Sequence, residues 1–183
     1  MEESFLSKLK KIIRRAYVKL LEKSSNRSRI KYLRRKGMKI GENCLLHTMT
    51  FSTEPYLIEI GDNVAIARGT LFITHDGGVW CFRKELKNAD VFGKIIIGNN
   101  VFIGNNCTIL PNTTIGDNCI IGAGSVVRGQ FAENSVIVGN PAKVAFNMGM
   151  QKLFYLQNPN MLRTHNLSEK EKAGIIKAHF NID

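Results

Sequence analysis

The chain has 183 residues, and its 26 Lys and Arg against 15 Asp and Glu give a formal net charge of +11. This length predicts one domain with a continuous core, and no apolar run approaches the roughly 20 residues that a membrane-spanning helix requires. The N-terminus lacks an apolar stretch followed by a small-residue cleavage site, so no secretory signal is predicted and we expect a cytoplasmic protein.

The positive charge is concentrated in residues 1–36, which hold 13 Lys and Arg but only 3 Asp and Glu, a net charge of +10. Within residues 4–23, apolar side chains recur at helical spacing along one stripe: Phe5, Leu9, Ile12, Ile13, Ala16, Tyr17, Leu20 and Leu21. Basic residues fall largely on the rest of the helix surface, among them Lys8, Lys11, Arg14, Arg15 and Lys19. The pattern predicts a basic amphipathic N-terminal helix.

Residues 37–146 carry a repeat of six residues, which fits neither the helical period of 3.6 nor the strand period of 2. The aliphatic positions are Ile97, Ile103, Ile109, Ile115, Ile121 and Val127. The fourth residue after each of the first five is small or modest: Val101, Cys107, Thr113, Cys119 and Ser125. A chain that turns a corner every six residues points each aliphatic side chain into a narrow core. Three such faces close one coil of a triangular parallel β-helix.

The repeat begins earlier, at Ile40, and it is interrupted twice. It lapses at residues 50–56, resumes from Ile60 to Phe72, and then stops until Ile95 or Ile97, which leaves an insertion at residues 74–94. Long interruptions of a regular fold are usually functional, so we expect the chemistry in this insertion.

The N-terminal helix has two possible roles beside such a β-helix. It could cap the open end or pack against another subunit, because an open end exposes unpaired backbone and apolar side chains. It could instead dock on anionic lipid at the inner face of a membrane. Nucleic-acid binding is not favoured, since no base-reading or stacking module accompanies the basic residues.

Residues 147–183 form a C-terminal helical extension after a final turn at residues 139–141. Short helices are predicted at residues 148–157 and 169–180, and Ser168 with Glu171 forms a capping box at the start of the second. We expect these helices to seal the other end of the β-helix or to cross to a neighbouring subunit.

The four cysteines do not form a recognisable disulfide or metal pattern. Cys44, Cys107 and Cys119 each follow a repeat aliphatic by four residues, so we expect them to be buried thiols that act as small hydrophobes. Cys81 lies in the insertion without a partner in sequence. No CxxC pair is present, no metal is expected, and reduced cysteines fit the cytoplasm.

Six successive hexapeptides, followed by Val138-Gly139-Asn140-Pro141-Ala142-Lys143-Val144, resemble the left-handed β-helix of the hexapeptide-repeat acyltransferases. The chain is most similar to the galactoside, maltose and capsular-polysaccharide O-acetyltransferases, over about residues 40–144. The resemblance implies a mainly β, left-handed parallel β-helix and a homotrimer with acetyl-CoA bound in the cleft between two subunits. It further implies acetyl transfer to a hydroxyl of a sugar or polysaccharide, in cell-surface glycan biosynthesis.

Acetyl transfer to a hydroxyl needs a base, donors for the oxyanion and a slot that aligns both substrates. By resemblance His75, at the mouth of the insertion, is the general base. Either Asp76, a backbone carbonyl or a carboxylate from elsewhere would orient its ring. His47 matches the asparagine that hydrogen-bonds the acceptor sugar in galactoside-type relatives, which implies an acceptor contact, although it could simply be a surface histidine. Trp80 could stack on a sugar ring or pack the insertion against a neighbouring subunit.

The resemblance also implies where coenzyme A binds. Asn105 and Ala123 match positions at which relatives hold the pantetheine arm through backbone groups. Arg128 and Gly129 stand where relatives carry a Thr-Lys pair, and Lys143 matches a basic residue that meets the phosphate end.

Alternatives remain at this stage. An N-acetyltransferase that acts on an amino-sugar nucleotide would share the β-helix, the cofactor and the base, and a non-catalytic scaffold would share the β-helix alone. A longer acyl donor is equally compatible with the sequence. A γ-class carbonic anhydrase is not favoured, because it needs three zinc-binding histidines and only His47 and His75 lie in the repeat region.

Overall fold

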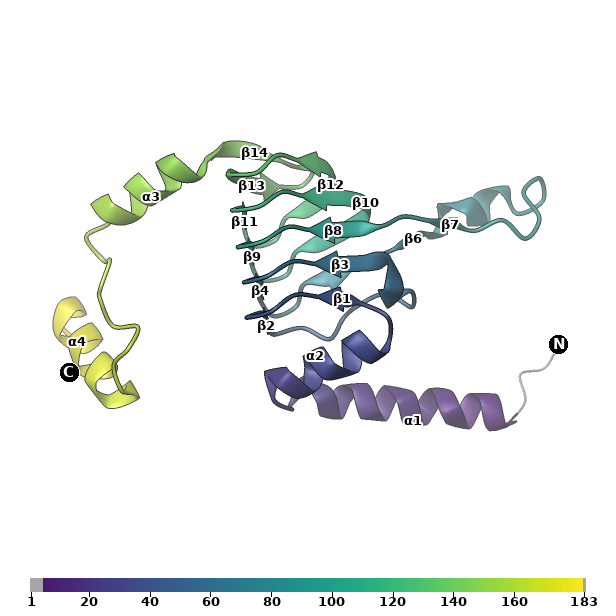
Figure 1. Ribbon diagram of the computed structural model, residues 1–183, viewed down its shortest axis with the longest axis horizontal. Coiled ribbons are helices and arrows are strands. Elements are labelled where there is room, and N and C mark those ends of the chain that lie inside the picture. The colour runs from purple at the N-terminus through teal and green to yellow at the C-terminus, as the bar shows by residue number, and fades with distance from the viewer. Residues whose placement is uncertain (1–4, 183) are drawn as a thin grey trace. The chain divides into compact units, whose positions relative to one another are not determined.

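The computed structural model describes residues 5–182 and divides into two compact units after Met148. The first unit contains a β-helix together with helices α1 (Phe5–Glu22) and α2 (Asn26–Arg35) (Figure 1). The second contains nearly all of helix α3 (Met148–Gln157) and the whole of helix α4 (Glu169–Phe180).

The first unit is a left-handed β-helix with three faces. The six-residue period predicted the three-faced coil, and the resemblance implied its left-handed sense. The first face orders β1 (Lys39–Ile40), β3 (Ile58–Ile60), β8 (Ile95–Ile97), β10 (Thr108–Ile115) and β12 (Val126–Phe131). The second face orders β2 (Leu45–Leu46), β4 (Ala65–Ile66), β9 (Phe102–Ile103), β11 (Ile120–Ile121) and β13 (Ser135–Gly139), and β14 (Ala142–Asn147) adds an antiparallel strand. The third face pairs β5 (Leu71–Phe72) with the start of β10, which pairs with the start of β12.

Two of the corners between these faces matter for function. The turns from the second to the third face, at residues 47–50, 67–70, 104–107 and 122–125, are called the pocket corner. The turns from the third to the first face, at residues 52–57, 73–94 and 110–112, are called the arm corner. The two corners are the two ends of the third face.

The core consists of the aliphatic residues that set the period. All six, from Ile97 to Val127, are no more than 2% exposed. Cys44, Cys107 and Cys119 are buried beside them, which confirms their expected packing role, and Cys81 is exposed. Desolvation by burial raises the pKa of the three buried thiols, so they stay protonated and behave as small apolar groups.

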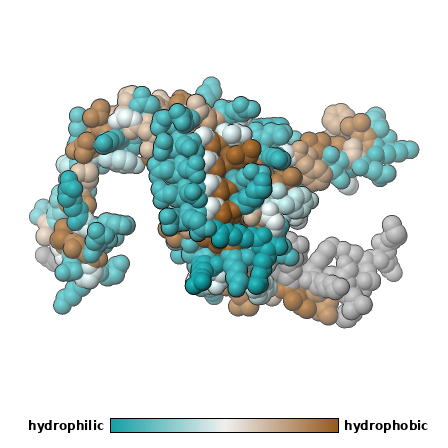
Figure 2. All heavy atoms as spheres, viewed as in Figure 1, coloured by the Kyte–Doolittle hydropathy of each residue, from teal (hydrophilic) through white to brown (hydrophobic). Residues whose placement is uncertain are grey.

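The corners between the first and second faces depend on asparagine. Asn63, Asn100 and Asn118 adopt φ values of 54° to 55°, a left-handed conformation that asparagine tolerates better than most residues. Their side chains form a ladder, in which Asn63 Nδ2 donates to Asn100 Oδ1 at 2.7 Å and Asn100 Nδ2 donates to Asn118 Oδ1 at 2.9 Å. These stacked turns form a hydrophilic column along one edge of the β-helix (Figure 2).

Glycine is required where successive coils approach closely. A Cβ atom on Gly104 would lie 2.6 Å from the backbone nitrogen of Ala123 on the next coil. The glycine that follows the repeat aliphatic therefore sets the spacing at the pocket corner.

Helix α2 covers the open end of the first coil. Asn26 Nδ2 donates to the Cys44 carbonyl at 2.7 Å and Asn26 Oδ1 accepts from the Leu46 amide at 2.8 Å, so one side chain pairs the free edge of β2. Arg29 Nε donates to the Leu46 carbonyl at 2.8 Å, and Leu33 is buried against the core. The expected cap exists, but a separate second helix supplies most of it.

The apolar stripe of α1 does not form the cap. Leu21 is buried and Val18 packs against the core, whereas Leu9, Ile12, Ile13 and Leu20 are 41% to 68% exposed. Residue 4, where the predicted helix began, lies outside the described residues, as do the side chains of Lys8, Lys11, Arg14 and Arg15. None of the helices within residues 5–182 combines the length and apolarity that a membrane crossing requires.

The two interruptions of the repeat have local structure. The first contains a 3₁₀ turn, η1 (Pro55–Leu57), and Phe51 stacks on Phe72 with ring centroids 4.9 Å apart. The second is an arm, residues 74–94, that projects from the β-helix (Figure 1). It consists of β6 (His75–Asp76), the 3₁₀ segment η2 (Gly77–Phe82) and β7 (Val91–Phe92), which pairs antiparallel with β6. The insertion is thus a hairpin rather than an irregular loop.

The second unit contains both predicted C-terminal helices. The capping box of α4 is present, since Ser168 Oγ accepts from the Glu171 amide and the Glu171 side chain accepts from the Ser168 amide. The helix ends at Asn181, whose φ of 52° is left-handed.

Candidate active site

His75 forms an imidazole–carboxylate pair at the base of the arm. Its Nδ1 lies 3.0 Å from Glu54 Oε2 and 3.1 Å from Ser52 Oγ. The pair is brought together by the third face, where Phe51 bridges Phe72 in parallel and places the residues that follow each of them side by side. Thr74, which is fully buried, fixes the carboxylate by donating from Oγ1 to Glu54 Oε2 at 2.7 Å.

The Glu54 carboxylate is ionised at neutral pH. Burial raises its pKa, but hydrogen bonds from Thr53, Thr74, His75 and Ser52 together outweigh burial and lower the pKa from 4.5 to about 2. An ionised carboxylate only accepts hydrogen bonds, so Nδ1 of His75 carries the proton in this pair. In the neutral ring Nε2 then holds the lone pair, which is the arrangement of a general base.

The imidazole opens on a cleft of about 340 Å³ between the arm and the β-helix. The His75 side chain is 46% exposed while that of Glu54 is 15% exposed, so the imidazole is accessible and the carboxylate is shielded. Within residues 5–182, no hydrogen bond involves Nε2. The wall of the cleft carries Trp80, which is 76% exposed, along with Val91 and Phe92. An apolar wall beside a base suits the face of a sugar ring.

Of the candidates for orienting the ring, the carboxylate from elsewhere is the one found, and Asp76 does something different. Asp76 Oδ1 accepts from the Gly78 amide at 2.9 Å and caps η2. Sequence reasoning missed Glu54, whose only distinguishing feature in sequence is that it is the single acidic residue in the first lapse of the repeat.

The residues expected to bind coenzyme A divide between the two corners. Asn105 and Ala123 are exposed at the pocket corner on successive coils, where the Gly124 amide donates to the Asn105 carbonyl at 2.8 Å. Arg128 and Gly129 lie in β12 as the chain passes the arm corner. Lys143 is exposed in β14, where it pairs with Val138 at the pocket-corner end of the second face. One face of the β-helix, roughly 20 Å of extended chain, separates Arg128 and Gly129 from the residues of the pocket corner.

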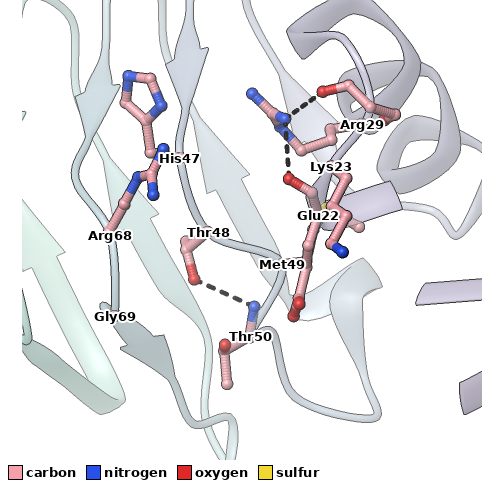
Figure 3. Close-up of a pocket in the computed structure, with 10 residues that line it drawn as sticks. Glu22, Lys23, Arg29, His47, Thr48, Met49, Thr50, Arg68 and Gly69 are labelled. Atoms are coloured by element: carbon pink, nitrogen blue, oxygen red, sulfur yellow. Dashed lines mark hydrogen bonds between the residues drawn. The ribbon is translucent and has the colours of Figure 1, made fainter. Parts of the chain in front are cut away.

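His47 lies at the pocket corner and not beside His75. It lines a pocket of about 670 Å³ together with Thr48, Arg68 and residues of the α1–α2 segment, among them Lys23 and Arg29 (Figure 3). An acceptor contact at His47 was expected by resemblance. The three basic residues around it, Lys23, Arg29 and Arg68, were not expected from the sequence. Across the described part of the chain, no three His, Cys, Asp or Glu side chains are grouped so as to hold a metal ion.

A parallel β-helix built from hexapeptide repeats is the fold of a class of bacterial transferases, and comparison with known proteins places the chain in that class. The family model described as bacterial transferase hexapeptide, six repeats, matches residues 94–129. Protein CapG of Staphylococcus aureus is 41% identical over 162 residues, which cover 87% of this chain and 92% of that protein.

Solved structures agree on the fold. A maltose O-acetyltransferase from Clostridium difficile 630 is 28% identical, with a TM-score of 0.53 over 74% of this chain and 87% of that one. A hexapeptide-repeat-containing acetyltransferase from Vibrio cholerae is 21% identical and shares the fold, with a TM-score of 0.56 over 73% of this chain and 88% of that one. The chain belongs to the hexapeptide-repeat acyltransferase family, and it is an enzyme of that class.

Proposed function

We propose that this enzyme transfers an acetyl group from acetyl-CoA to a hydroxyl group of a sugar or polysaccharide. The observation that carries the proposal is the His75–Glu54 pair, because it leaves Nε2 unpaired at the mouth of a cleft with an aromatic wall. The similarity to a maltose O-acetyltransferase supports both the acetyl group and a sugar acceptor.

In the proposed reaction, His75 Nε2 removes the proton of the acceptor hydroxyl as its oxygen attacks the thioester carbonyl carbon. The C–S bond then breaks, and the imidazolium returns the proton to the thiolate as it leaves. Glu54 stabilises the imidazolium between these steps, because its pKa of about 2 keeps the carboxylate charged throughout.

The proposed enzyme is a homotrimer with each site shared by two chains. The corner that carries Asn105 and Ala123 and the corner that carries His75 lie at opposite ends of the third face of one chain. A cofactor that lies along Asn105 and Ala123 can therefore bring its thioester to a His75 side chain only if the pocket corner of one chain lies beside the arm corner of another. Arg128, Gly129 and Lys143 would contact the same cofactor farther along the β-helix. Light scattering should give the mass of three chains of 20.5 kDa each.

A thiol-release assay tests the reaction itself. Wild-type protein is incubated with acetyl-CoA and with free sugars, oligosaccharides, sugar nucleotides and amino-sugar nucleotides. Release of CoA with hydroxyl acceptors supports the proposal, and release with amino-sugar nucleotides alone would replace it by N-acetylation. Release with none of them, in protein shown to be folded, favours a non-catalytic scaffold. Longer acyl-CoA donors in the same assay define the preferred donor.

We also propose that α1 associates with an anionic membrane surface. The exposed stripe of Leu9, Ile12, Ile13 and Leu20 is apolar, and residues 1–36 carry a net charge of +10. An apolar stripe in a strongly basic segment is typical of interfacial helices. The test is sedimentation with phosphatidylglycerol vesicles at low salt, where Ile12→Ser should weaken binding. Ile175→Ser, a comparable exposed isoleucine in α4, is the control, and equal binding by both variants would refute this proposal.

A further inference from the structure

The pocket around His47 is a basic concave surface that the mechanism leaves unused. Three cationic side chains line it, those of Lys23, Arg29 and Arg68, against the single carboxylate of Glu22. The lining therefore carries three positive charges and one negative charge, a net of +2 with His47 neutral. Figure 3 shows His47 and Arg68 on one wall and Arg29 with the α1–α2 segment on the opposite wall.

Arg29 is a buried guanidinium that has no acidic partner among residues 5–182. It is only 8% exposed, and its hydrogen bonds all go to backbone carbonyls: those of Leu46 at 2.8 Å, Glu22 at 3.4 Å and Ser24. Carbonyl oxygens satisfy its N–H groups but do not neutralise its charge. A buried charge without a counter-charge is unfavourable, and an anion in the adjacent pocket would relieve the cost.

The other cations of the pocket are also unpaired. Neither Lys23 nor Arg68 forms an ion pair in the part of the chain that the structure describes, and the His47 ring has no hydrogen bond there. Elsewhere in the first unit, Arg34 pairs with Glu42 at 2.9 Å and Lys39 pairs with Glu59 at 3.0 Å. The positive charges of the pocket are thus available to a ligand, and the buried Arg29 is what sets this pocket apart from exposed lysines and arginines.

The position of Arg68 indicates which ligand the charges serve. Arg68, Asn105 and Ala123 each stand two residues after an inward isoleucine of the second face, so they stack on successive coils of the pocket corner. In the proposed function the cofactor lies along Asn105 and Ala123, with its phosphate end toward Lys143. Arg68 is at the opposite end of that column, on the side where the acceptor must approach the thioester.

We propose that the pocket formed by Lys23, Arg29, His47 and Arg68 binds an oxyanion, a phosphate or carboxylate group, that is carried by the acceptor glycan. Guanidinium and ammonium groups recognise both anions through charge-assisted hydrogen bonds. Assignment of the anion to the acceptor rests on the proposed function. In the proposed trimer the pocket would lie near the partner subunit's His75.

Binding is tested without any turnover. Histidine ring signals of the full-length protein are followed by NMR during titration with glucose 1-phosphate, glucuronate, inorganic phosphate and glucose, and His47→Gln identifies the His47 signal. The charged probes should shift that signal and glucose should not. Arg68→Gln should weaken binding of the charged probes about tenfold, the effect expected for loss of one charge-assisted hydrogen bond.

The control is Arg163→Gln, which removes the same charge from an exposed position in the second unit. Two results would overturn the proposed anion site. One is that Arg68→Gln and Arg163→Gln bind the charged probes with equal affinity. The other is that glucose shifts the His47 signal as much as the charged probes do. Lys23→Gln is a second, exposed variant that should weaken binding in the same direction. This part of the test stands even if no acetyl transfer is ever detected.

Two further measurements identify the source of the anion. With an active acceptor in hand, Arg68→Gln should raise the KM for anionic acceptors more than the KM for acetyl-CoA; the reverse would assign the pocket to the cofactor and overturn the acceptor assignment. Arg68→Gln should sediment with phosphatidylglycerol vesicles as the wild type does. A loss of vesicle binding would assign the pocket to a lipid head group and overturn it equally.

Discussion

The arm corner and the pocket corner are built on the same backbone repeat, yet they treat charge in opposite ways. At the arm corner, His75 is paired with Glu54, and four side chains hold the carboxylate. In the pocket beside the pocket corner, Lys23 and Arg68 form no ion pair with any residue that the structure describes, and Arg29 hydrogen-bonds only to backbone carbonyls. A paired imidazole suits proton transfer, whereas unpaired cations suit the binding of an anion. The β-helix therefore supplies two positions, and the side chains decide what each one does.

The largest effect is expected from His75→Ala. Loss of the general base should lower kcat by about 100-fold or more. The measurement is thiol release at saturating acetyl-CoA and acceptor. His165→Ala, which changes an exposed histidine of the second unit, should retain wild-type kcat. An unaltered kcat in His75→Ala would show that the reaction does not take place at the arm corner, and the proposed difference between the two corners would be wrong.

Glu54→Gln should lower kcat about tenfold or more with a smaller effect on KM. The neutral amide keeps the shape but no longer stabilises the imidazolium, and it does not enforce the proton on Nδ1. Arg68→Gln should act mainly on the KM of an anionic acceptor. Full pH–rate profiles distinguish a positioning role for Glu54, because the profile should change shape in Glu54→Gln and not in Arg68→Gln. Identical profiles for wild type and Glu54→Gln would remove Glu54 from the mechanism.

Trp80→Ala should raise the KM for a sugar acceptor roughly fivefold, since aromatic contacts contribute on the order of 1 kcal/mol. Its side chain is 76% exposed, so the variant should unfold at the same temperature as the wild type. Phe82→Ala, on the same arm but absent from the lining of the cleft, is the control. If Trp80 instead packs against a neighbouring subunit, the variant will change the mass seen by light scattering and leave KM unchanged.

The smallest effect concerns acid stability. The folded pKa of Glu54, about 2, is below its usual 4.5, so its contribution to stability is complete above pH 4.5 and is lost as the pH falls toward 2. The melting temperature of wild type should exceed that of Glu54→Gln near neutral pH, and the difference should shrink as the pH is lowered through this range. Glu85→Gln, an exposed carboxylate of the arm, controls for the change in charge. A difference that is constant with pH would contradict the lowered pKa.

Much of the fold was predictable because its cause is local. Each hexapeptide of residues 97–127 repeats the same steric solution, an inward aliphatic and a small neighbour at a corner, and the structure buries these residues as the period requires. The capping box of α4 is equally local, since Ser168 and Glu171 are three residues apart. His75, at the mouth of the longest break in the repeat, was expected to be the base by resemblance, and that role stays a prediction.

Only the tertiary structure decided which charged side chains meet, because they lie on segments that are distant in sequence. Glu54 meets His75 because the third face aligns two coils 21 residues apart, and no periodicity reports that alignment. Arg29 reaches the pocket because α2 pairs with the free edge of β2, which also leaves the stripe of α1 exposed. The six-residue period predicts only how each residue packs within the repeat, and not which residues from non-repeating segments come to lie beside it. The sequence by itself therefore determined the β-helix and placed His75 at the start of the insertion. The charges that surround each corner were decided by long-range packing, at the points where the repeat fails.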